Sequence, residues 1–77
     1  MLEEFPKEIV EELRTKNPHF DAIVTKHDDL DRVVTEVEEG REYMEDLELE
    51  KLKFEKLRLK DEAYHLMNQY MKEKGLK

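Results

Sequence analysis

Residues 46–71 of the chain read DLELEKLKFEKLRLKDEAYHLMNQYM. The stretch has no Pro or Gly and is built largely from Leu, Glu, Lys and Arg, which are strong helix formers. We therefore predict one long helix over residues 44–74, capped at its start by Asp46 and stopped by Gly75. The rest of the chain is expected to pack against this helix.

Two apolar stripes run along the predicted long helix, with members three or four residues apart as in a coiled-coil seam. The first holds Leu49, Leu52, Lys56, Leu59, Ala63, Leu66 and Tyr70, and the second holds Leu47, Glu50, Phe54, Leu57, Asp61, Tyr64, Asn68 and Met71. The stripes lie roughly 150° apart at about 100° per residue, so two packing partners are expected. One partner is the same chain, and a second copy is the candidate for the other. The apolar members Leu47, Phe54, Leu57, Tyr64 and Met71 are the predicted interaction surface.

The chain has 77 residues and no Cys. A domain of this size has a marginal core and usually needs disulfides, a metal or oligomerisation for stability. Disulfides are excluded, so we expect a homo-oligomer, a dimer or larger. The longest apolar run has three residues, 22–24, so we expect no membrane association and a cytoplasmic location.

Charge is distributed unevenly along the chain. Residues 1–50 hold 6 Lys or Arg and 17 Asp or Glu, a net −11, whereas residues 51–77 hold 8 and 4, a net +4. An antiparallel arrangement would bring the acidic half against the basic half. Because exposed ion pairs each contribute little, this bias selects topology more than it adds stability.

Two further helices precede the long one. Leu2, Phe5, Ile9 and Leu13 form one face of a short helix over residues 4–15, with Pro6 in its first turn. Asn17 and Pro18 are typical of a helix start, and Gly40 is typical of a stop, so a second helix is predicted over residues 18–39. The predicted fold is all-α, a short N-terminal helix followed by a long antiparallel hairpin with coiled-coil-like packing. The first helix is expected to cover either its own chain or a neighbouring one.

The predicted second helix carries a seam with one polar member. The seam holds Phe20, Ile23, His27, Leu30, Val34 and Val37. With a turn near Gly40, His27 comes opposite residues 56–61, where a hydrogen bond to Asp61 would satisfy both polar groups. We interpret His27 and Asp61 as polar seam residues that fix register or partner number. The alternative hypothesis is a pH switch, in which protonation of His27 alters assembly.

Four segments of the chain form a recognisable set. They are His27-x-x-Leu30-Asp31, residues 52–62 with their KLRLKDE core, Phe5-Pro6 and Asn17-Pro18-x-Phe20. In these segments the chain resembles the YdcH-like family of short bacterial proteins. The resemblance covers nearly the whole chain. It implies an α-helical hairpin and a bacterial cytoplasmic protein, and it supplies no catalytic residue, since the function of that family is not established.

The residues favour a non-enzymatic protein. Ser and Cys are absent, no Gly-rich phosphate loop is present, and a helical protein this small offers no deep pocket for paired carboxylates. We expect no catalytic residue, no cofactor and no resident metal, although His19 and His65 would meet in an antiparallel hairpin. The predicted function is a small interaction module that self-associates and binds a protein partner. The alternative is a nucleic-acid-associated protein that uses the basic face Lys51–Lys60, although the pI of about 5.0 disfavours it.

Overall fold

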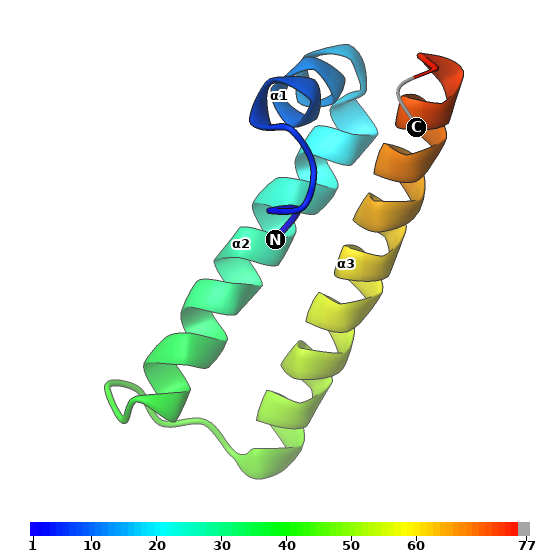
Figure 1. The fold of residues 1–77 in the computed structure, drawn as a ribbon. Coiled ribbons are helices and arrows are strands. Elements are labelled where there is room, and N and C mark those ends of the chain that lie inside the picture. The colour runs from blue at the N-terminus through cyan, green and yellow to red at the C-terminus, as the bar shows by residue number, and fades with distance from the viewer. Residues whose placement is uncertain (76–77) are drawn as a thin grey trace.

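The computed structural model describes residues 1–75, and this range contains three helices, α1 (Lys7–Lys16), α2 (Pro18–Glu38) and α3 (Asp46–Glu73). Figure 1 shows α2 and α3 as an antiparallel hairpin, with the 39–45 loop at one end and α1 at the other. The molecule is elongated, with extents of 45 × 21 × 18 Å. The predicted all-α hairpin with a short N-terminal helix is confirmed.

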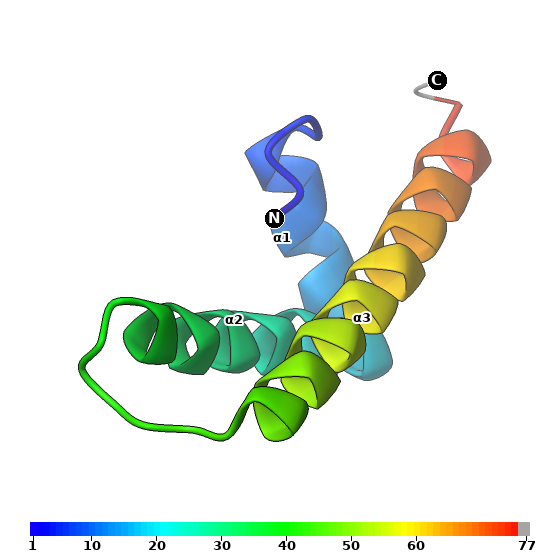
Figure 2. The ribbon, with the colours of Figure 1, turned by 90° about the horizontal axis from the view of Figure 1, so that it is seen from below.

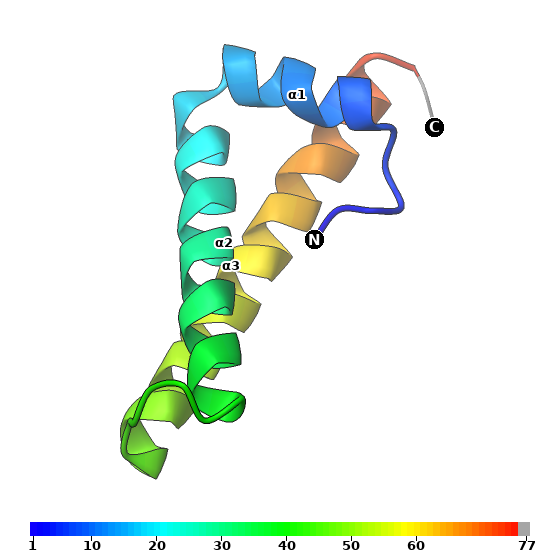
Figure 3. The ribbon, with the colours of Figure 1, turned by 90° about the vertical axis from the view of Figure 1, so that its left-hand side faces the viewer.

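Helix α1 begins three residues later than predicted, because Pro6 is its N-cap and does not lie in its first turn. A proline disfavours the helical conformation of the residue before it, which excludes Phe5 from the helix. Helix α1 crosses the ends of α2 and α3 at a large angle, and the residues before α1 turn back alongside the hairpin (Figure 3). Leu2 lies in this returning segment, where it is buried and adopts a left-handed φ of 72°.

The junction between α1 and α2 is a tight corner at Asn17. The backbone N–H of Asn17 donates to the carbonyl of Leu13 at 2.8 Å and closes α1. The Asn17 side chain accepts from the backbone N–H of Phe20 at 3.1 Å, and Pro18 is the first residue of α2. The corner therefore has the N-cap and first-turn proline that the sequence predicts.

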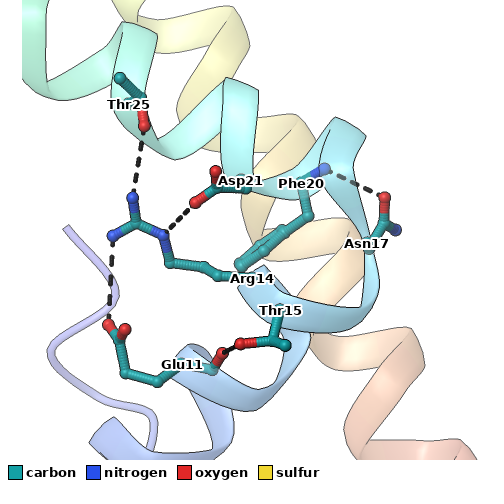
Figure 4. Close-up of polar contacts among 7 residues, drawn as sticks. All are labelled: Glu11, Arg14, Thr15, Asn17, Phe20, Asp21 and Thr25. Carbon is teal, nitrogen blue, oxygen red and sulfur yellow. Dashed lines mark hydrogen bonds and ion pairs between the residues drawn. The ribbon is translucent and has the colours of Figure 1, made fainter.

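A single arginine clamps this corner (Figure 4). The Nε of Arg14 in α1 donates to the Asp21 carboxylate in α2 at 2.6 Å, and the guanidinium also reaches the Thr25 hydroxyl at 3.3 Å and the Glu11 carboxylate at 4.0 Å. Hydrogen bonding to Asp21 raises the pKa of Arg14 above its ordinary value. These contacts hold α1 at its angle to α2.

The loop between α2 and α3 begins at Gly40 as predicted, but α3 does not begin with the predicted cap. Gly40 has a φ of 82°, its N–H donates to the carbonyl of Val37 at 3.1 Å, and the N–H of Arg41 donates to that of Glu36 at 2.9 Å. These are the two bonds of a Schellman motif, which needs a left-handed residue. The expectation that Asp46 caps α3 is wrong, because Asp46 is the first helical residue and the preceding Glu45 makes no side-chain cap bond.

The core gathers side chains from every element. Its buried apolar members are Leu2, Leu13, Phe20, Ile23, Val24, Ala63 and Met67, with Val34 buried further along α2. Phe20, Ala63 and Met67 are fully inaccessible to solvent. Since Leu13 of α1 belongs to this cluster, α1 covers its own chain.

Charged side chains pair between α2 and α3. Asp31–Lys56 at 2.9 Å and Glu38–Lys53 at 2.8 Å join acidic residues of α2 to basic residues of α3, as the uneven charge distribution predicts, whereas Lys26–Glu55 at 2.9 Å has the opposite sense. The His19 ring also contacts the Glu62 carboxylate at 2.7 Å. From the His19–Glu62 contact at one end to the Glu38–Lys53 pair at the other, residue numbers rise along α2 and fall along α3, which is the antiparallel arrangement. Figure 2 shows that α2 and α3 are inclined to each other, with α1 on one side of both.

None of the three helices, considered over the described range, is both long and apolar enough to cross a membrane.

Candidate interaction surface

Helix α3 buries one face and exposes the opposite one. Ala63 and Met67 of α3 point into the core and are fully buried. Phe54 precedes Ala63 by nine residues, which corresponds to about 180° around a helix of 3.6 residues per turn. The side of α3 centred on Phe54 therefore points away from both α1 and α2.

This exposed face carries large apolar side chains. Leu47, Phe54 and Leu57 are 70%, 62% and 50% exposed, and we call these three residues the outward stripe. Tyr43, in the loop just before α3, is 87% exposed. Exposed apolar residues are common when scattered, but contiguous ones on one element indicate an interaction site.

The rest of the predicted interaction surface is covered by the chain itself. Tyr64 and Met71 are half-buried and pack against the core cluster. The Phe5 ring meets the Tyr64 ring edge to face, with 5.5 Å between the ring centroids. The hydrogen bond from the Tyr64 phenol to Glu4 raises the pKa of that phenol. Inclusion of Tyr64 and Met71 in one continuous exposed surface is therefore corrected.

The correction has a geometric cause. Residues at heptad spacing drift by about 20° per heptad around a straight helix, because seven residues fall short of two full turns. At about 100° per residue, Leu47 and Met71 differ by roughly 120° in direction. The second stripe thus winds from the solvent side of α3 toward α1.

The proposed contact between His27 and Asp61 is absent. His27 is buried, but Asp61 is exposed and lies on the outward side of α3. The Nδ1 atom of His27 has no hydrogen-bond partner within residues 1–75, and the nearest carboxylate oxygen, on Asp28, is 3.6 Å away. Asp61 faces away because it shares the direction of Phe54 to within about 20°. His27 remains a polar residue in the α2 seam, and Asp61 is not its partner.

The basic face Lys51–Lys60 is divided by the fold. Lys53 and Lys56 are paired with carboxylates of α2. Lys51 and Arg58 are exposed and line an open depression of about 730 Å³ beside Phe54, together with Asp61 and other residues of α3. The depression has mixed charge, which weakens the phosphate-binding interpretation of this face.

The histidines do not form the site that an antiparallel hairpin allowed. His19 contacts the Glu62 carboxylate at 2.7 Å, while His65 is exposed and lines a separate depression with Asn68, Gln69 and Lys72. No cluster of three or more potential metal ligands occurs in the part of the chain that the structure describes.

The C-terminal end of α3 is fastened to α1 by Glu12. Its carboxylate accepts from the Lys74 ammonium at 2.6 Å and from the Tyr70 hydroxyl. These two hydrogen bonds, with Lys74 the larger influence, lower the pKa of Glu12 from 4.5 to about 2. Helix α1 thus shields this end of α3 and leaves the outward stripe uncovered.

Over residues 1–75 the molecule is thus a small protein of three helices whose prominent surface feature is an apolar stripe on one helix. A family model described as "Protein of unknown function (DUF465)" matches residues 20–67, and the chain belongs to this family of small bacterial proteins, as its YdcH-like resemblance indicated. The match spans most of α2, the turn and most of α3. No curated protein and no solved structure matched the sequence.

Proposed function

We propose that this protein is a non-enzymatic helical interaction module that self-associates, and that binds a protein partner, through the outward stripe of α3. The observation that carries the proposal is the exposure of Leu47, Phe54 and Leu57 on the face of α3 opposite the core. In a chain with so small a core, leaving three large apolar side chains in water costs stability that association would recover.

The exposed area sets the strength of the association. Full burial of a Leu or Phe side chain is worth about 1.5–3 kcal/mol. The three side chains are between 50% and 70% exposed, so a symmetric pair of copies would gain about 5–11 kcal/mol from six of them. Association costs about 4–15 kcal/mol in lost motion. The net gain is therefore at most about 7 kcal/mol, and the expected dissociation constant is no tighter than about 10 µM.

Sedimentation equilibrium tests this proposal on the natural chain and on the double variant Phe54→Glu with Leu57→Glu. The measurement should span about 10 µM to about 1 mM to cover the expected range. The natural chain is expected to associate, and the variant is expected to remain a folded monomer because each copy would bring two carboxylates to the interface.

A matched control adds the same charge elsewhere. Thr15→Glu with Ala22→Glu places two carboxylates at exposed positions of α1 and α2 and is expected to associate like the natural chain. A natural chain that stays monomeric at every concentration would remove self-association from the proposal. Equal loss of association in both double variants would show that net charge, and not the outward stripe, controls assembly.

A further inference from the structure

Two charged residues flank Phe54 at equal spacing on the exposed face of α3. Glu50 lies four residues before Phe54 and Arg58 lies four residues after it. Each points within about 40° of the direction of Phe54. Both side chains are exposed, and within residues 1–75 neither takes part in an ion pair. Both charges are therefore free to contact another molecule that covers Phe54.

Glu50 and Arg58 carry opposite charges on the two sides of Phe54. A second copy laid parallel on this face would bring Glu50 against Glu50 and Arg58 against Arg58, and like charges at close range disfavour a complex. An antiparallel copy would bring Glu50 against Arg58 twice.

We propose that two copies of the chain pair through antiparallel α3 helices, with Phe54 at the two-fold axis and Glu50 of each copy facing Arg58 of the other. This arrangement rests on the proposed function, because it assigns the occupant of the outward stripe to a second copy. It is an isologous contact, in which one patch is complementary to itself.

The same register gives every apolar residue of the outward stripe a neighbour. Residue numbers that face each other across the axis add to 108, so Leu57 faces Lys51 and Leu47 faces Asp61. The long Lys51 side chain covers apolar surface with its methylene groups while its ammonium stays in water. Leu47 and Asp61 lie toward the two ends of the contact, where a polar rim is usual.

Charge reversal tests the arrangement by sedimentation equilibrium. Glu50→Arg alone creates two repulsive pairs with Arg58, and Arg58→Glu alone creates two with Glu50. Each single variant is expected to associate about 5- to 30-fold more weakly than the natural chain. The double variant Glu50→Arg with Arg58→Glu restores both pairs and is expected to recover natural affinity. An equimolar mixture of the two single variants is expected to associate more tightly than either variant alone.

Cysteine pairing tests the direction of the helices, since the natural chain has no Cys. A mixture of Leu47→Cys and Asp61→Cys chains is expected to form a mixed disulfide under mild oxidation, and Asp61→Cys alone is expected to form little. Two copies of residue 61 lie about 21 Å apart along antiparallel helices in this register, beyond the reach of a disulfide. A parallel pair would instead link Asp61→Cys to itself.

The outcomes separate this inference from the proposed function. If the natural chain associates but both single charge variants associate equally well, or if Asp61→Cys links efficiently to itself, the antiparallel register is wrong and self-association stands. If the natural chain remains monomeric up to about 1 mM, self-association itself fails, and the outward stripe is left for a different protein. Circular dichroism of every variant confirms that α3 is still folded.

Discussion

Replacing His27 by Leu should stabilise the fold. The imidazole is only 7% exposed, its Nδ1 has no hydrogen-bond partner within residues 1–75, and the Asp28 carboxylate at 3.6 Å is too distant for a hydrogen bond. A buried polar atom without a partner costs about 1–3 kcal/mol. Leu removes this cost and has a better helix propensity. Because Leu differs in shape from the imidazole ring, imperfect packing should destabilise the fold by up to about 1.5 kcal/mol.

The expected net gain is therefore about 1 kcal/mol, equivalent to a rise in Tm of about 4–8 °C for a domain of this size. Urea unfolding followed by circular dichroism measures it, with all proteins at one concentration because association would add to the apparent stability. His27→Gln keeps a buried polar group and should be no more stable than the natural chain. A loss of about 1 kcal/mol or more in His27→Leu would refute the reasoning, because it would show that the imidazole makes a favourable polar interaction.

Three other changes test the core, the corner and the α1–α3 contact. Phe20→Ala removes a fully buried ring and should cost about 3–5 kcal/mol of folding stability. A thermal melt should show this as a large fall in Tm. Asn17→Ala removes the hydrogen bond to the Phe20 N–H and should cost about 1 kcal/mol, whereas Asn17→Asp, which keeps an acceptor, should retain stability in the same urea titration. Because the folded pKa of Glu12 is lowered from 4.5 to about 2, its contribution is present above pH 4.5 and is lost as the pH falls toward 2. Glu12→Gln should therefore lose less stability than the natural chain across that interval in urea titrations at a series of pH values, and an identical loss in both proteins would contradict the contact with Lys74 and Tyr70.

Local signals in the sequence predicted the architecture well. The Asn17-Pro18 start and the Gly40 stop of α2 carry their own backbone chemistry, because a side-chain acceptor, a missing N–H and a left-handed φ each act within a few residues. The antiparallel order of α2 and α3 was predictable from the short link between them. The uneven charge distribution favoured the same order, and Lys53 and Lys56 of α3 do pair with carboxylates of α2. These features depend on nearest neighbours in the chain or on the simplest possible pairing.

The division of the interaction surface was not predictable from periodicity. Whether Tyr64 and Met71 are covered depends on where α1 and the segment before it lie. The Arg14–Asp21 contact at the corner and the packing of Leu13 in the core hold α1 in that position. The heptad spacing suggested a continuous stripe, but a straight helix turns such a stripe gradually toward a different neighbour. Asp61 belongs to the stripe centred on Phe54, so it points away from the seam that contains His27.

The most direct test of the interaction surface follows the leucine methyl signals of the natural chain by NMR as the protein is diluted from about 1 mM to about 10 µM. If copies associate through the outward stripe, the signals of Leu47 and Leu57 should move with concentration, while the signal of Leu13, which α1 contributes to the buried core, should stay in place. Leucine signals that do not change at any concentration, or changes at Leu13 without changes at Leu47 and Leu57, would contradict self-association through this face of α3.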